Sequence, residues 1–118
     1  MTGATFSVTG IAPVLPVPSL EEAVRFWSVA LGAAPTFVDG TRWAQFDVAA
    51  RRLSLSCEDG GADRAGLMVK VDDLDAARAA LTNAGFALGP VETGAHEVRC
   101  SGTAPGGWLL VLYAPLPG

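Results

Sequence analysis

The sequence predicts an α+β fold in which two tandem βαβββ modules form a curved mixed β-sheet with a concave groove. The chain has 118 residues, half of them hydrophobic and 17% charged, which suits a single domain over 1–118. The stretch APVLPVPSLEEAVRFW, which begins at Ala12, is matched in pattern by GLMVKVDDLDAARAAL, which begins at Gly66. Each copy reads as a strand, a helix cap and a helix, so we place module one at about 11–58 and module two at about 66–113.

Both helices carry start and stop signals. Ser19 is the expected N-cap of the first helix, and Glu22, three residues later, completes a capping box. Gly32 ends this helix, while Asp73 and Gly85 hold the corresponding places in module two. Apolar residues at helical spacing predict the buried face of the first helix, and the pair Phe26-Trp27 is expected to anchor it to the sheet. This face comprises Leu20, Ala23, Val24, Trp27 and Leu31.

Three short strands are expected after each helix, separated by turn signals such as Asp39-Gly40 and Pro105-Gly106-Gly107. They are predicted near 35–38, 42–48 and 52–58 in module one, and near 86–88, 96–102 and 108–113 in module two. Alternation puts Trp43 on the polar side of its strand, opposite Ala44. This polar side either faces water or lines a concave groove, and the aromatic Trp43 favours the groove.

Charge and composition exclude several functions. The net charge is -4 and there is no run of Lys or Arg, which argues against nucleic-acid binding. No stretch approaches the roughly 20 apolar residues of a membrane span, and the N-terminus lacks a secretory signal. We therefore expect a cytoplasmic protein in which Cys57 and Cys100 are reduced thiols, although a disulfide stays an alternative.

Three segments carry a resemblance to a known family. LPVPSLEEAVRFW, VDDLDAA and APGGWLLVLY resemble the vicinal-oxygen-chelate superfamily, also called glyoxalase/bleomycin-resistance/dioxygenase, over about 11–113. In metal-dependent members of this family, His, His and Glu ligands stand at the places that here hold Ala12, Gly66 and Val111. A further ligand place falls near Ser54 or Ser56. None of these side chains is a plausible transition-metal ligand, so we expect no metal and no cofactor.

Within that superfamily, Pro13-Val14-Leu15 and Phe26-Trp27 are similar to the metal-free bleomycin-resistance branch. The likeness implies a homodimer that sequesters a small molecule, with the first strand exchanged between subunits at a hinge near Pro13. Lys70 departs from this pattern, because a cation in the groove opposes a cationic drug. It suits an anionic or carbonyl-bearing ligand, or else it lies at the groove rim.

Two functions follow from these expectations. The first is a metal-free protein that binds an antibiotic or another small molecule. Its expected ligand-binding residues are Trp43, Gln45, Ser54, Ser56, Met68, Lys70, Arg99, Leu109, Val111 and Tyr113. The alternative is a metal-free isomerase, cyclase or lyase of secondary metabolism on the same fold. Its candidate acid–base groups are Asp47, Glu58, Lys70, His96 and Glu97, although the sole histidine, His96, more simply begins a strand.

Overall fold

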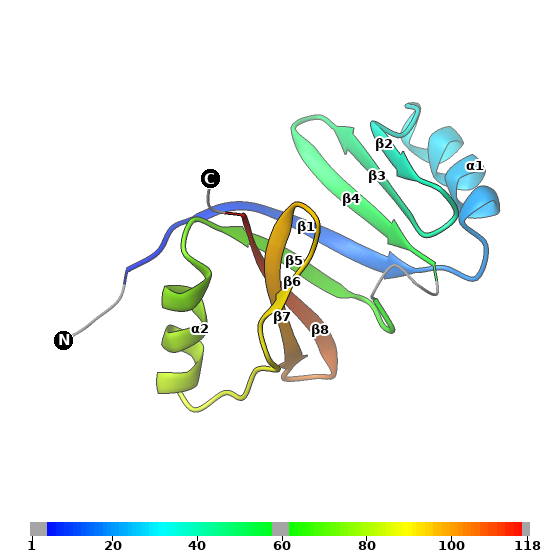
Figure 1. Ribbon diagram of the computed structural model, residues 1–118. Helices are drawn as coiled ribbons and strands as arrows, with labels where there is room; N and C mark the ends of the chain where they lie inside the picture. The colour runs from blue at the N-terminus through cyan, green and yellow to red at the C-terminus, as the bar shows by residue number, and fades with distance from the viewer. Residues whose placement is uncertain (1–4, 58–61, 117–118) are drawn as a thin grey trace. The chain divides into compact units, whose positions relative to one another are not determined.

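The computed structural model describes residues 5–57 and 62–116, and it confirms the α+β class with two βαβββ modules (Figure 1). Module one contains β1 (Val8–Pro16), α1 (Leu20–Leu31), β2 (Phe37–Asp39), β3 (Trp43–Val48) and β4 (Arg51–Ser56). Module two contains β5 (Gly66–Val71), α2 (Leu74–Asn83), β6 (Glu92–Thr93), β7 (Glu97–Ala104) and β8 (Trp108–Pro115). The observed β1 begins at Val8, before the start of module one predicted at about residue 11.

The chain divides into two compact units at Ile11/Ala12 and at Gly66/Leu67. We call residues 12–66 the α1 unit and the remainder the α2 unit. The eight strands are hydrogen-bonded in the order β2-β3-β4-β1-β5-β8-β7-β6. The first boundary falls inside β1, so this strand contributes to both units. The curvature of the sheet and the concave groove stay predictions.

The α1 unit is built as its sequence predicts. Ser19 has an extended backbone and its hydroxyl accepts a hydrogen bond from the Glu22 amide, while Gly32 ends the helix at φ 65°. The predicted apolar face of α1 packs on one side of the sheet, around the buried Phe46 and Leu55. The expectation that Phe26 anchors the helix is wrong, because Phe26 is 62% exposed and contacts Trp27 edge-on. Of this pair, only Trp27 packs in the core beneath α1.

The α2 unit repeats this design. The Asp73 side chain caps α2 by accepting from the Ala76 amide, as its alignment with Ser19 predicts. Beyond the helix, the Gly85 amide donates to Thr82 O and the Phe86 amide donates to Leu81 O, which is the Schellman pattern of helix ends. The core beneath α2 comprises Val71, Leu74, Ala77, Cys100, Leu112 and Ala114.

The strand predicted near 86–88 is wrong, because the edge strand β6 lies at Glu92–Thr93. The Schellman end of α2 takes the Phe86 amide that a strand would need for its ladder. The following residues pass close to β7 at Gly102, where a Cβ atom would come within 2.7 Å of Leu88. There the Gly89 amide makes one bond to Ser101 O, and the pairing goes no further.

The β3–β4 hairpin sets the positions of the side chains on the polar side of the α1 unit. Its two-residue turn, Ala49-Ala50, has φ values of 51° and 62°. Two positive values in succession define a type I′ turn, in which Asn-Gly is favoured and alanine is strained. The turn fixes the pairs Val48↔Arg51, Asp47↔Arg52, Gln45↔Ser54 and Trp43↔Ser56.

We expect the double substitution Ala49→Asn and Ala50→Gly to raise the free energy of unfolding by about 1 kcal/mol. Both new residues adopt positive φ at lower cost than alanine does. Urea unfolding followed by circular dichroism measures the change. Ala84→Gly is the control, because Ala84 has φ -83° and gains nothing from glycine. An unchanged midpoint in the double variant would contradict the strain at this turn.

Candidate functional site

The side of the α1 unit opposite its helix carries a set of predicted ligand-binding residues. Ala44 and Phe46 of β3 and Leu55 of β4 belong to the core beneath α1, so their neighbours in each strand point the other way. On this opposite side, the register joins Gln45 to Ser54 and Trp43 to Ser56. The structure therefore brings Trp43, Gln45, Ser54 and Ser56 together. We call this side the polar face.

The members of this face differ in how far they reach solvent. Ser54 and Ser56 are 1% and 0% exposed, respectively, and the Ser56 hydroxyl accepts a hydrogen bond from the Ala62 amide at 3.3 Å. Trp43 and Gln45 are half-buried. That Ser54 and Ser56 contact a ligand stays a prediction. The solvent-accessible part of the polar face runs from Trp43 through Gln45 to the next pair of residues along the hairpin.

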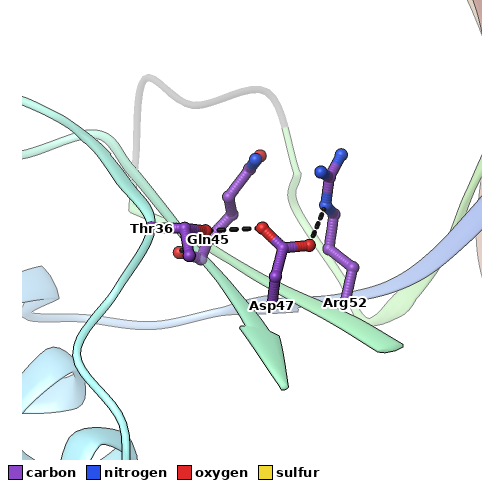
Figure 2. A network of polar contacts seen from close by, with 4 residues as sticks. All are labelled: Thr36, Gln45, Asp47 and Arg52. Carbon is purple, nitrogen blue, oxygen red and sulfur yellow. Dashed lines mark hydrogen bonds and ion pairs between the residues drawn. The ribbon is translucent and has the colours of Figure 1, made fainter. Parts of the chain in front are cut away.

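That next pair is Asp47 and Arg52, and it forms a polar network with Thr36 (Figure 2). Arg52 Nε lies 2.8 Å from Asp47 Oδ1, and the Thr36 hydroxyl donates to Asp47 Oδ2 at 2.5 Å. Our sequence reasoning proposed Asp47 as an acid–base group but did not select Arg52 or Thr36. The alternation of polar and apolar residues in RRLSLS could have indicated Arg52, because it places Arg52 on the same side of the strand as Ser54 and Ser56.

The network fixes the charge of Asp47. The hydrogen bond from Arg52 holds the pKa of this carboxyl below its ordinary value of 3.8, and the Thr36 hydroxyl lowers the pKa further. Asp47 is therefore ionised and hydrogen-bonded at neutral pH. A general base works best with a pKa near the working pH, so this environment disfavours Asp47 as a catalytic base.

The remaining predicted ligand-binding residues belong to the α2 unit. The register joins Arg99 to Tyr113 and places Val111 and Leu109 further along the same side of β8. This side is opposite the core formed by Cys100, Leu112 and Ala114. Met68 and Lys70 alternate in β5 with the core residues Val69 and Val71, so they also point away from α2. Their combination with the polar face in one groove stays a prediction.

The places at which the sequence resemblance implies metal ligands hold no metal-binding side chains. Ala12 is 3% exposed, Gly66 begins β5 and Val111 lies in β8. Across residues 5–57 and 62–116, no group of three or more His, Cys, Asp or Glu residues is placed to hold a metal. His96 is exposed in the bend before β7, and Glu58 lies outside the described residues.

Both cysteines are free thiols in the structure. Cys57 Sγ donates to Pro18 O at 3.6 Å. Cys100 belongs to the core of the α2 unit, and burial raises the pKa of its thiol while the nearby Arg78 lowers it less. A thiol with a raised pKa is a poor nucleophile at neutral pH, so Cys100 acts as a packing residue.

Comparison with known proteins gives a likeness in structure alone. No family model matches the sequence, and no curated protein matches it. The NAD-dependent benzaldehyde dehydrogenase from Legionella pneumophila is similar with a TM-score of 0.77 at 15% identity, over 90% of this chain and 99% of that one. Methylmalonyl-CoA epimerase from Mycobacterium tuberculosis gives 0.71 at 22% identity, over 97% and 93%.

A third solved structure shares the same fold. It is a glyoxalase/bleomycin resistance protein/dioxygenase superfamily member from Vibrio splendidus 12B01, with a TM-score of 0.68 at 13% identity over 92% of this chain and 99% of that one. This chain therefore has the fold of that superfamily, as its resemblance in sequence implies. Identities this low establish the fold but no activity. No helix in the described part of the chain is long and apolar enough to cross a membrane.

We expect Asp47→Asn to lower stability at neutral pH by at most ~1 kcal/mol, because both side chains of the ion pair are more than one-third exposed and solvent screens them. The folded pKa of Asp47 is lowered, so its contribution is complete above pH 3.8 and disappears as the pH falls through the folded pKa. Thermal unfolding of the wild type and of Asp47→Asn at pH 7 and pH 3 measures the difference in stability between the two proteins at each pH.

The matched control for this substitution is Asp39→Asn. Asp39 pairs with Arg42 at the longer distance of 3.4 Å, and both side chains are more than half exposed. We expect a smaller effect there at pH 7. A difference between wild type and Asp47→Asn that is equally large at both pH values would contradict the assignment of the stabilisation to the charged form of Asp47.

Proposed function

We propose that this protein is a metal-free small-molecule binding protein of the bleomycin-resistance type, which acts by sequestering an antibiotic or a similar compound in the cytoplasm. The observation that carries the proposal is the polar face, where the half-buried Trp43 and Gln45 lie beside the Asp47–Arg52 pair. An aromatic ring with a few fixed polar groups is typical of ligand pockets. The fold that the chain shares with a glyoxalase/bleomycin resistance protein/dioxygenase superfamily member is compatible with such a function.

Side-chain chemistry supports the metal-free part of the proposal. The places where metal-dependent relatives carry His, His and Glu hold Ala12, Gly66 and Val111. A methyl group, a hydrogen and an isopropyl group donate no electron pair to a metal. Ser54 and Ser56 alone offer only neutral hydroxyl oxygens, which are weak ligands for a transition metal.

The proposal includes a homodimer with an exchanged first strand. The boundary between the units falls between Ile11 and Ala12, inside β1 and one residue before Pro13. Proline has no amide hydrogen for a ladder and favours a bend or an edge in a strand. A strand whose two halves belong to different units is a suitable element for exchange between identical chains.

The alternative is a metal-free enzyme of secondary metabolism, such as an isomerase, cyclase or lyase. One observation favours it: Glu97 Oε2 lies 3.9 Å from Arg99 Nη1. Both residues lie on the same side of β7, and Arg99 is paired with Tyr113 of β8. A carboxylate beside a guanidinium supplies a proton acceptor and an anion binder. Turnover of a metabolite that Glu97→Gln abolishes, with folding intact, would favour this alternative.

We expect a panel of bleomycin-type and other natural products to contain ligands that saturably change tryptophan fluorescence. Trp43→Ala should weaken binding about tenfold, because a stacked aromatic ring and its buried area are lost. Trp108→Ala is the matched control, since Trp108 is exposed beside the β7–β8 turn, and it should leave the dissociation constant unchanged. A broad panel without a saturable response would overturn the proposal.

Protein purified without chelator should contain far less than one equivalent of divalent metal by elemental analysis. Dialysis against EDTA should change neither the thermal unfolding midpoint nor the affinity for a ligand from the panel, because no ligand group at the family's metal places depends on an ion. Stoichiometric metal, or a ligand affinity that falls with EDTA and returns with zinc, would contradict the metal-free assignment.

A further inference from the structure

A groove runs along α1, away from the polar face. Its volume is about 870 Å³, and it is lined by residues between positions 17 and 30, all within the α1 unit. Phe26 and Val29 of this lining are 62% and 85% exposed, whereas the solvent-facing side of a surface helix normally carries polar residues. The groove therefore has the composition of a contact surface.

Two side chains of opposite charge also line this groove, Glu22 and Arg25. Glu21 and Glu22 precede Arg25 by four and three residues, the spacings at which ion pairs form along a helix. Within residues 5–57 and 62–116, however, neither Glu22 nor Arg25 forms an ion pair. Both residues are exposed, so their charges are available to a second molecule.

The groove is complementary to a second copy of itself. Two identical helices that pack antiparallel about a two-fold axis make every contact twice, because the same surface faces itself. The register that sets Glu22 opposite Arg25 of the second copy also sets Val29 close to Pro18 of the second copy, and Pro18 lines the same groove. Opposite charges therefore meet in the middle of the contact, and apolar groups meet at both of its ends. The antiparallel arrangement also brings opposite ends of the two helix dipoles together.

We infer that this groove binds a second copy of the same chain through an antiparallel, two-fold symmetric contact between the two α1 helices. The contact goes beyond the proposed function and does not depend on exchange of the first strand. A helix of 12 residues is about 18 Å long, so the contact is smaller than the interfaces of roughly 1,200 Å² or more that hold stable complexes. We expect weak association, with a dissociation constant on the order of 100 µM.

Sedimentation velocity of the full chain from about 10 µM to about 1 mM tests the contact. The average mass of the wild type should rise toward twice its value at the lowest concentration. Glu22→Arg and Arg25→Glu should each weaken self-association about tenfold, because each places like charges at both facing positions. Asp75→Arg is the matched control: Asp75 is acidic in the first turn of α2, as Glu22 is in α1, and its substitution should leave the association unchanged.

An equimolar mixture of Glu22→Arg and Arg25→Glu tests the two-fold register itself. In a mixed pair both facing positions again hold opposite charges, so the mixture should associate about as strongly as the wild type although neither variant does so alone. Val29→Asn tests the apolar ends and should weaken association several-fold. Because Val29 is 85% exposed, this substitution should leave the fold intact, and circular dichroism confirms folding of each variant.

A wild-type mass that does not change with concentration would overturn the inference and leave the groove to a partner of another kind. Association of Glu22→Arg at the wild-type level, or a mixture that associates no more strongly than its components, would overturn it as well. The exchanged-strand dimer is judged separately, because its mass should persist at the lowest concentration and in Glu22→Arg. A constant dimer mass would therefore uphold strand exchange while the contact between α1 helices fails.

Discussion

The positions of all candidate ligand contacts in the α1 unit depend on the register of the β3–β4 hairpin. A two-residue turn at Ala49-Ala50 fixes which residue of β3 faces which residue of β4. A slip by one residue would exchange the two sides of one strand, moving Ser54 and Arg52 into the core and Leu53 and Leu55 onto the polar face. The hydrophobic contacts of Phe46 and Leu55 beneath α1 hold the same register, so packing and turn geometry agree.

This agreement explains how the hairpin tolerates a turn of two alanines. Alanine at positive φ costs free energy at both positions, and the burial of Leu55 and Phe46 offsets that cost. The same register also fixes the positions of side chains on the polar face. The fixed hairpin holds Asp47 opposite Arg52, and Thr36 adds a third point of attachment from the segment before β2.

The fold could be predicted from the sequence because its signals are local. Ser19 and Asp73 cap helices through atoms three residues away, and Gly32 and Gly85 end them with positive φ. The strand predicted near 86–88 is absent for two reasons: the Schellman end of α2 takes the Phe86 amide, and the residues that follow pass close to Gly102. The second reason depends on a residue distant in the sequence and has no local signal. The site shows the same division. Alternation placed Trp43 and Gln45 on one side of the sheet. The contacts of Asp47 with Arg52 and Thr36 depend on the register as well, which alternation does not give.

The small residues at the family's metal places have a physical consequence for the proposed metal-free state. Ala12 is 3% exposed in β1, two residues before Val14, which pairs with Ser54 of β4, so its methyl group fills space in a packed environment. Replacing it with histidine would insert a bulky polar ring there, and overpacking of this kind typically costs about 1–3 kcal/mol. To restore the full set of metal ligands, Gly66 and Val111 would also have to be replaced by metal-binding residues. The packing around Ala12 therefore opposes the return of a metal ligand at this place, in agreement with the proposed metal-free state.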